Sequence, residues 1–153
     1  MRRDDHGLDH EEREEGRRRC DPGLDHERDL TVGPEHTATA LGSGDVPALA
    51  TPAILALAEA ACVGAVAGDL DEHETTVGTF AEVEHLRATP IGATVRALAT
   101  LVGHHGDRLE FSVTVEQDGE PVARVRHRRS LVERERFLTG LAKRAGAQGH
   151  QAP

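Results

Sequence analysis

The hydrophobic pattern of the chain is dominated by one long apolar stretch, "TPAILALAEAACVGAVAGD", which covers residues 51–69. Thr51 followed by Pro52 is a typical helix start, with threonine as the N-cap and proline in the first turn. Gly68 is a typical helix end. Because alanine, leucine and valine occupy nearly all sides of this predicted helix, we expect it to be covered almost completely, by the rest of the chain and, for what remains, by a second copy.

The apolar pattern after this helix alternates with a period of two, as in strands that bury one face. The strands that it predicts cover residues 75–85, 93–102, 108–116 and 121–132. Short turns join them, and the Asp118–Gly119 pair is a signal for a tight hairpin. Because short links leave no room for crossover helices, we predict an α+β fold in which a curved antiparallel sheet wraps around the long central helix.

The two ends of the chain differ in composition from this domain. Residues 1–28 are mostly charged and contain "GLDHE" twice, which predicts a disordered tail. The domain then covers residues 29–140, beginning with a short strand or extended arm over residues 29–41 and ending with a short helix. Residues 141–153 are expected to fray.

Histidines in the first tail leave a metal site open as an alternative. His6 and His10 have the i,i+4 spacing of one helix face, and His26 is nearby in the sequence. A plain solvated tail is the favoured interpretation of this segment, so we predict no metal ligand and no cofactor.

Charge and cysteine content narrow the class of protein. The 153 residues carry a formal net charge of -9, which makes a long nucleic acid an unfavourable partner. Cys20 and Cys62 are too few for a disulfide scaffold, and their spacing fits no metal site. No apolar run reaches the length of a membrane span and the N-terminus is charged, so we expect a soluble cytoplasmic protein with no membrane partner.

Glu59 is the unusual residue of the long helix. It is one turn from Leu55 and one turn from Val63, so its own face of the helix is apolar in both directions. An ionised carboxylate buried without partners is costly, and this one must therefore be paired, protonated or in a cavity. From this position alone, a structural carboxylate and a functional-site carboxylate remain equally open.

Two residues of the strand over residues 75–85 are also unusual. His85 shares its parity with Val77 and Val83, the side expected to face the helix, where a histidine is more often a satisfied core residue than a catalyst. Gly78 lies inside the strand, where glycine usually marks a bulge or a close approach of the backbone to a ligand. Its peptide N–H is a candidate donor to a developing oxyanion.

The last predicted strand carries basic residues on both of its faces. His127 and Arg129 share the parity of the apolar residues and should point inward. An inward guanidinium requires an anion or a carboxylate as its partner. The opposite face is predicted to be a solvated basic strip of Arg124, Arg126 and Arg128.

Three segments, "ATPAILALAEAACV", "TTVGTFAEVEHLRATPIGATV" and "RHRRSLVERERF", together carry a family resemblance. From about Leu30 to Phe137 the chain resembles the hot dog fold thioesterases, in the branch typified by fluoroacetyl-CoA thioesterase. The resemblance implies the hot dog fold and an acyl-CoA site. The site residues that it implies are Thr51, Glu59, Gly78, His85 and Arg129.

The resemblance also implies a mechanism. The N–H of Gly78 would hold the thioester carbonyl oxygen, while Glu59 would either attack the carbonyl carbon or activate a water molecule. His85 would be the acid or base, and Thr51 would orient Glu59 or the acyl group. Helix capping is the alternative role for Thr51. Arg129 would bind the substrate.

The function predicted in this way is that of a thioesterase that hydrolyses a short-chain acyl-CoA to a carboxylic acid and the CoA thiol. The fluoroacetyl-specific enzyme has a Phe-rich lid before the helix, whereas this chain has only "LGSGDVPALA" there. We therefore expect a general short-acyl-CoA hydrolase. A non-catalytic acyl-CoA-binding or regulatory hot dog module is the main alternative, and a hydratase is less favoured because no Asp/His pair is evident.

Helix geometry adds a prediction about assembly. Thr51 and Glu59 are eight residues apart in the sequence. Their backbones are therefore separated by roughly 12 Å along one helix, too far for their side chains to meet easily. If both residues serve one pocket, the helix of a second subunit must lie alongside, so we predict a homodimer with two sites.

Overall fold

The structure of the protein, a computed structural model, describes residues 19–149. In chain order its elements are β1 (Asp25–Thr31), η1 (Pro34–His36), α2 (Ala38–Leu41), α3 (Thr51–Val66), η2 (Ala67–Asp69), β2 (Glu74–His85), β3 (Thr94–His105), β4 (Arg108–Gln117), β5 (Glu120–Glu133) and α4 (Arg134–Gly149). The long helix is confirmed, and so are the strands predicted after it, each within a few residues of its expected bounds.

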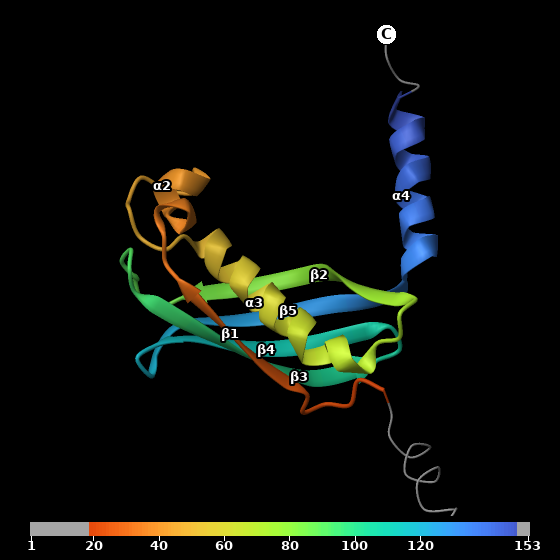
Figure 1. The fold of residues 1–153 in the computed structure, drawn as a ribbon, viewed down its shortest axis with the longest axis horizontal. Coiled ribbons are helices and arrows are strands. Elements are labelled where there is room, and N and C mark those ends of the chain that lie inside the picture. Colours follow the sequence, from red (N-terminus) through yellow and green to blue (C-terminus); the bar gives the residue numbers. More distant parts are fainter. Residues whose placement is uncertain (1–18, 150–153) are drawn as a thin grey trace, which may run out of the picture.

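The five strands form an antiparallel sheet in the order β1-β3-β4-β5-β2, and α3 crosses one face of it (Figure 1). Asp118 and Gly119 both have positive φ angles, 52° and 79°, at the turn between β4 and β5. This is the backbone that a two-residue hairpin needs, and it explains the Asp-Gly pair. The predicted α+β arrangement of a long helix on an antiparallel sheet is confirmed.

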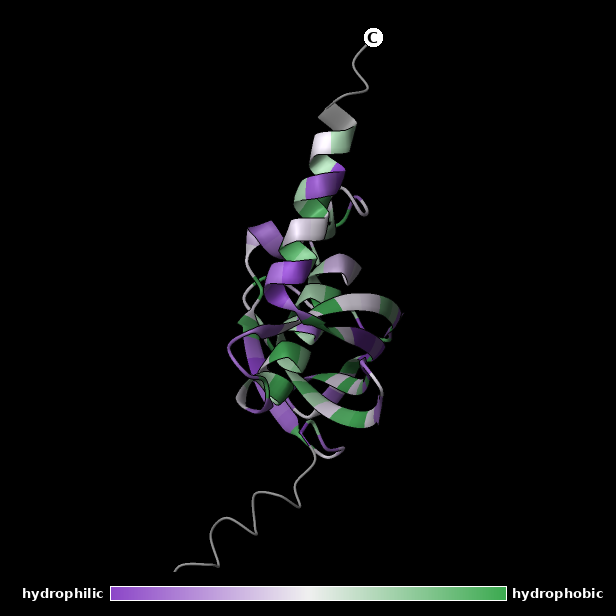
Figure 2. Cartoon of the chain, turned by 90° about the vertical axis from the view of Figure 1, so that its right-hand side faces the viewer, coloured by the Kyte–Doolittle hydropathy of each residue, from purple (hydrophilic) through white to green (hydrophobic). Residues whose placement is uncertain are grey.

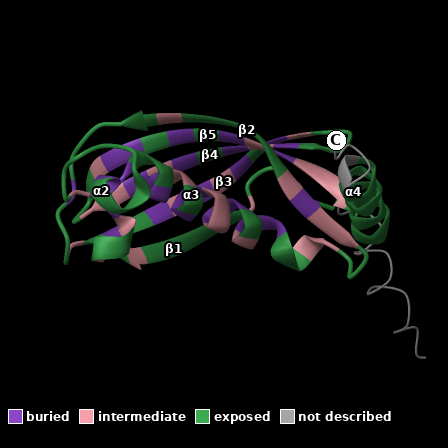
Figure 3. Ribbon diagram, turned by 90° about the horizontal axis from the view of Figure 1, so that it is seen from above, coloured by how far each residue is buried: buried purple, intermediate pink, exposed green. Residues whose placement is uncertain are grey.

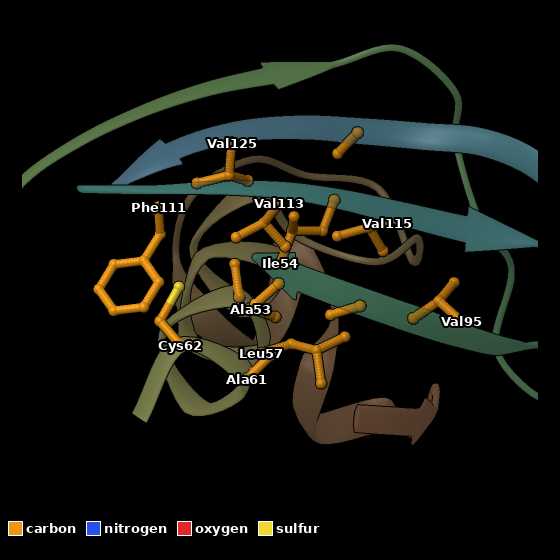
Figure 4. Close-up of a cluster of buried hydrophobic side chains, with 14 of the residues drawn as sticks. Ala53, Ile54, Leu57, Ala61, Cys62, Val95, Phe111, Val113, Val115 and Val125 are labelled. Carbon is orange, nitrogen blue, oxygen red and sulfur yellow. The ribbon is translucent and has the colours of Figure 1, made fainter. Parts of the chain in front are cut away.

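Small side chains let α3 approach the sheet closely. Ala58 and Ala61 are completely buried, and so is Ile54, which lies over Val113 of β4 in the core (Figure 4). Full burial of a side chain the size of isoleucine contributes about 1.5–3 kcal/mol. The contacts of α3 are more extensive with β1 and β3 than with β2 and β5, so the helix is displaced toward one side of the sheet.

This displacement leaves part of α3 and β2 uncovered within one chain. Val63 is 44% exposed, and Thr51 and Ala56 are exposed as well. Most of β2 after Val77 is exposed, whereas its neighbour β5 and the next strand, β4, bury about every second residue (Figure 3). The helix is therefore only partly covered within one chain, and the open region lies along the β2 edge of the sheet. That a second copy covers this region stays a prediction.

The predicted disordered tail is wrong for residues 19–28, while residues 1–18 lie outside the described part of the chain. Cys20 is only 1% exposed, its N–H donates to Asp69 Oδ2 at 3.0 Å, and β1 begins already at Asp25. The charged segment "DHER" is ordered because its backbone pairs with β3, which composition does not reveal. The expected arm over residues 29–41 is a strand only to Thr31, after which η1 and α2 follow.

The C-terminal end also differs from the expectation. The predicted short helix is confirmed as α4, but it continues through residues 141–149, which were expected to fray. Alanine, leucine, lysine and arginine are strong helix formers and explain the extra turns. Figure 1 and Figure 2 show α4 standing away from the sheet, and its contacts are mainly with β5. Residues 150–153 lie outside the described part.

The stretch Thr51–Asp69, which consists of α3 and η2, is long and apolar enough to cross a membrane by length and composition. This differs from the expectation that no apolar run is long enough. A core helix of a soluble protein passes the same test, and eight residues of α3 are buried in this domain.

Candidate functional site

Helix α3 and strands β2 and β5 bring a carboxylate and a guanidinium together beside the core. Arg129 Nη1 donates to Glu59 Oε2 at 3.0 Å. The Nε and Nη2 groups of Arg129 donate to the hydroxyl and the carbonyl oxygen of Thr76, at 2.9 and 3.1 Å. The inward position predicted for Arg129 is confirmed, and so is its need for a carboxylate partner.

Glu59 is therefore paired, as the sequence requires of a carboxylate on an apolar helix face. Its side chain is 38% exposed while that of Arg129 is 8% exposed, so the pair lies at the rim of the core. Among the described residues, Oε2 takes all of the polar contacts of Glu59, from Arg129 and from His127 Nε2 at 3.6 Å. The second oxygen, Oε1, makes no hydrogen bond or ion pair with residues 19–149.

Gly78 gives this carboxylate its room. An added Cβ at Gly78 would lie 2.8 Å from Glu59 Oε2 and 3.3 Å from Arg129 Nη1, closer than normal contact to the carboxylate. The pairing of β2 with β5 shifts between Gly78 and Phe80, so Thr79 is an extra, bulged residue. The bulge that an interior glycine predicted is confirmed, and the close approach is to the Glu59 side chain of the same chain.

The bulge decides which residues of β2 face the helix. Gly78 pairs with Arg129 and His85 pairs with Ala123, and both partners are buried inward residues of β5. Gly78 and His85 are seven residues apart, an odd spacing that puts residues of a regular strand on opposite faces. The extra residue brings them to the same face. It also moves Val77 to the other face, so the predicted parity of Val77 with His85 is wrong.

Thr51 and His85 form a second cluster in the same chain. Thr51 Oγ1 lies 2.9 Å from His85 Nδ1, within hydrogen-bonding distance, and both residues are exposed. Thr51 is the first residue of α3 and Ala50 is the N-cap, with no side-chain capping bond. Capping is therefore the wrong interpretation of Thr51, whose hydroxyl is directed to the histidine.

The two clusters stay apart within one chain. Thr51 and Glu59 lie on the same partly exposed stripe of α3, two turns apart, which corresponds to roughly 12 Å along the axis. His85 accompanies Thr51, and Gly78 accompanies Glu59. The predicted site residues thus form two separate groups within one chain, one at Thr51 and His85 and the other at Glu59, Gly78 and Arg129. Their catalytic and binding roles stay predictions.

His127 belongs to the Glu59 cluster although it is not among the predicted site residues. Its side chain is 2% exposed, and its Nε2 lies 3.0 Å from Arg129 Nη1. Burial lowers the pKa of His127, as does the charge of Arg129, against the raising effects of the Phe80 carbonyl and of Glu59. The sequence feature that could have identified His127 as part of this cluster is its inward parity, two residues before Arg129 on the same strand.

The neighbouring thiol is not a nucleophile. Cys62 is fully buried on α3, and desolvation raises the pKa of its thiol to about 12. Burial also raises the pKa of Cys20, and both cysteines are free. A thiolate is the reactive form of cysteine, so the raised pKa values disfavour both thiols as nucleophiles at neutral pH.

The basic strip on the outer face of β5 is neutralised by its neighbours. Arg126 lies 3.7 Å from Glu82 of β2, and Arg128 lies 3.8 Å from Glu110 of β4 and stacks over the ring of Phe80. These are cross-strand pairs of opposite charge on an exposed face. The prediction of a solvated strip is confirmed in position, with acidic partners that the single strand did not suggest.

No group of three or more potential metal ligands is assembled within residues 19–149. His6 and His10 lie outside these residues. His26 is on β1, where its ring packs against Gly64 of α3.

Comparisons with known proteins agree with this geometry. The sequence profile of the family described as fluoroacetyl-CoA-specific thioesterase (FlK) matches residues 32–135. The fluoroacetyl-CoA thioesterase of Streptantibioticus cattleyicolor is 35% identical over 98 residues, which cover 64% of this chain and 70% of that protein.

Solved structures give the same result for the fold. A variant of FlK in complex with fluoroacetate and CoA is 30% identical and has a TM-score of 0.71, covering 76% of this chain and 98% of that chain. A hot-dog-like protein from Thermanaerovibrio acidaminovorans is 22% identical with a TM-score of 0.74, covering 80% and 91% of the two chains.

The predicted hot dog fold is thus confirmed. The relatives that share the family profile are named as thioesterases, so the alternative of a non-catalytic module is not favoured, and the predicted acyl-CoA thioesterase activity is supported. With its long helix, its bulged β2 strand and its paired Glu59, this chain belongs to the fluoroacetyl-CoA-specific thioesterase family and is a thioester hydrolase.

Proposed function

We propose that this thioesterase hydrolyses short-chain acyl-CoA at a site assembled from two subunits. The observation that carries the proposal is the separation of Thr51 and His85 from Glu59 and Gly78 on one open face. In a dimer with a two-fold axis, the Thr51–His85 group of one subunit lies next to the Glu59–Gly78 group of the other, and this happens once at each end of the paired helices. Each of the two sites then contains a carboxylate, a peptide donor and a histidine.

The open edge of the sheet supports a homodimer. Strand β2 is an edge strand, and an unpaired edge of this length is a template for pairing with another chain. Val63 of α3 and Phe80 of β2 are 44% and 37% exposed beside this edge. Pairing of β2 with the β2 of a second copy covers these side chains and aligns the two helices.

In the proposed reaction, Glu59 Oε1 either attacks the thioester carbonyl carbon or removes a proton from the water that attacks it. The negative charge that develops on the carbonyl oxygen is stabilised by the N–H of Gly78. The C–S bond then breaks, and the sulfur leaves as the CoA thiolate, which takes up a proton. If Glu59 is the nucleophile, the acyl group is then on Glu59 as an anhydride, and water hydrolyses this anhydride to release the carboxylic acid and regenerate Glu59. His85, oriented by Thr51, is the proton carrier, and it comes from the other subunit.

The chain before α3 supports a small acyl group without fluoroacetyl selectivity. Residues 42–50 lie against the loop after β2, because Leu49 N–H donates to the carbonyl oxygen of Thr89 and Ala48 pairs with Pro90. This places the segment at the Thr51–His85 end of the site. It contains no aromatic residue, so this segment offers an acyl group no phenyl ring to pack against.

The composition fits a cytoplasmic enzyme. Cys20 and Cys62 are both unpaired, as is usual for proteins of a reducing compartment. The net charge of -9 disfavours nucleic acid as a partner.

The test is thiol release from acetyl-, propionyl- and fluoroacetyl-CoA by the wild type, Glu59→Gln and Glu84→Gln. The matched control is Glu84, an exposed carboxylate of β2. We expect turnover of the unsubstituted acyl groups and a loss of about 100-fold or more in Glu59→Gln. Full activity of Glu59→Gln contradicts the proposed role. Binding of acyl-CoA without turnover by the wild type supports the non-catalytic alternative instead.

A further inference from the structure

His127 has one hydrogen bond whose direction is unambiguous. Its Nδ1 lies 2.7 Å from the carbonyl oxygen of Phe80. A carbonyl oxygen can only accept, so Nδ1 must carry the proton. Phe80 directly follows the bulged residue Thr79, so the acceptor of His127 lies at the same irregularity of β2 as Gly78.

The second ring nitrogen is then the acceptor. With the proton on Nδ1, a neutral imidazole has its lone pair on Nε2, which lies 3.0 Å from Arg129 Nη1. A protonated ring would direct an N–H at another N–H and place two positive charges together. Burial of the ring lowers the pKa of His127, which favours the neutral form. Glu59 from α3 and Arg129 from β5 are the charged groups that face it, and Phe111 of β4 is the neighbouring ring.

These contacts account for four of the five N–H donors of Arg129. Nε and one hydrogen of Nη2 go to Thr76, while the two hydrogens of Nη1 go to Glu59 and to His127. The guanidinium is therefore held by Thr76 through Nε and Nη2 and by His127 and Glu59 through Nη1. Removing the acceptor at His127 leaves one Nη1 hydrogen unpaired, so the end of the guanidinium that binds the Glu59 carboxylate is held less firmly.

We propose that His127 is a positioning residue, which acts as a neutral hydrogen-bond acceptor to fix Arg129 and, through Arg129, the Glu59 carboxylate. The inference deepens the function proposed above and rests on it for its kinetic part. It gives Arg129 a role different from the predicted one, because the bound guanidinium orients the catalytic carboxylate from within the protein.

Two substitutions of His127 distinguish the roles of its two ring nitrogens. In His127→Gln the amide oxygen can take the place of Nε2 and still accept from Arg129. In His127→Asn the shorter amide can take the place of Nδ1 and still donate to Phe80, but it leaves Arg129 without its acceptor. His105→Gln, in an exposed histidine at the end of β3, is the control.

We expect His127→Gln to keep kcat within about threefold of the wild type and His127→Asn to lose about 10- to 100-fold in kcat at a nearly unchanged KM, since a displacement of about 1 Å costs on the order of 100-fold. Melting temperatures of both variants confirm that they are folded. Equal losses in the two variants, or no loss in His127→Asn, overturn the proposal.

The second measurement does not depend on activity. Imidazole ¹⁵N–¹H correlation spectra of the wild type at neutral pH should show His127 as the neutral Nδ1–H tautomer. A ring protonated on Nε2 overturns the inference whether or not the enzyme turns over. If the wild type hydrolyses no acyl-CoA but the spectra show the Nδ1–H tautomer, the proposed function fails while the hydrogen-bond assignment holds.

Discussion

The substitution Gly78→Ala tests the close approach between β2 and the Glu59 carboxylate. The new Cβ would lie 2.8 Å from Glu59 Oε2, whereas ordinary contact begins near 3.4 Å. The carboxylate must therefore move by about 0.6 Å, because the backbone of β2 is held by its pairing with β5 while the Glu59 side chain is flexible. The φ angle of Gly78 is not positive, so alanine itself fits the backbone.

The size of the effect should differ between stability and rate. Alanine is about 0.5–1 kcal/mol more favourable than glycine inside a strand. Weakening the charge-assisted bond between Glu59 and Arg129 costs about 1.5 kcal/mol, the lower end of the usual range, because the Glu59 side chain is 38% exposed. The two nearly cancel. A carboxylate misplaced by about 0.6 Å should nevertheless lower kcat about 10- to 100-fold, or about 1.4–2.7 kcal/mol in activation free energy.

The assay is CoA thiol release under saturating acetyl-CoA, together with thermal unfolding. Gly103→Ala is the matched control, since Gly103 is also a strand glycine beside a register shift and its added Cβ would lie 3.2 Å from Glu110 Oε2. We expect the Tm of Gly78→Ala to stay within about 5 °C of the wild type while kcat falls. Unchanged kcat in a folded Gly78→Ala protein refutes the reasoning, and so does an equal loss of kcat in Gly103→Ala.

Three further predictions concern residues around the site. Thr51→Val should lower kcat about 3- to 10-fold with little change in Tm, because the hydroxyl orients His85 and does not cap α3, whereas Thr51→Ser should keep the rate. Thr89→Val should be neutral or stabilise the protein by up to about 1–2 kcal/mol in urea unfolding, since within residues 19–149 the buried Thr89 hydroxyl has no hydrogen-bond partner. A destabilisation of that size would contradict this prediction. Neither Cys20 nor Cys62 should react with Ellman's reagent in the folded protein at pH 8, because burial raises the pKa of both thiols, that of Cys62 to about 12. Rapid labelling of the folded protein would contradict this prediction.

The sequence predicts the helix and β2 to β5 well because each has a strong local cause. The apolar stretch that begins at Thr51 needs a sheet to cover it, and the strands alternate because one face is solvated. Strand β1 begins within a charged segment that has no such pattern and is ordered by backbone bonds to β3, so composition alone mislocates it. The family resemblance supplies the site residues, and their partners come from the fold.

The arrangement within the site depends on facts that a linear pattern lacks. The bulge at Thr79 reverses the parity of β2, which brings Gly78 and His85 to one face and sends Val77 to the other. From the sequence, His127 is predicted only to point inward. Its contacts with the Phe80 carbonyl and the Arg129 guanidinium, which indicate its role as a hydrogen-bond acceptor, are visible only in the fold.

The most direct test of the central claim, a site shared between two subunits, is a heterodimer that carries Glu59→Ala in one subunit and His85→Ala in the other. The two chains are co-expressed with different affinity tags, and the mixed dimer is isolated through both tags. If Glu59 of one subunit works with His85 of the other, one of the two sites is intact, and the heterodimer should show about half of the wild-type activity while each mutant homodimer is inactive. A heterodimer as inactive as the two homodimers, or a protein that is monomeric in sedimentation and still hydrolyses acyl-CoA, contradicts the claim.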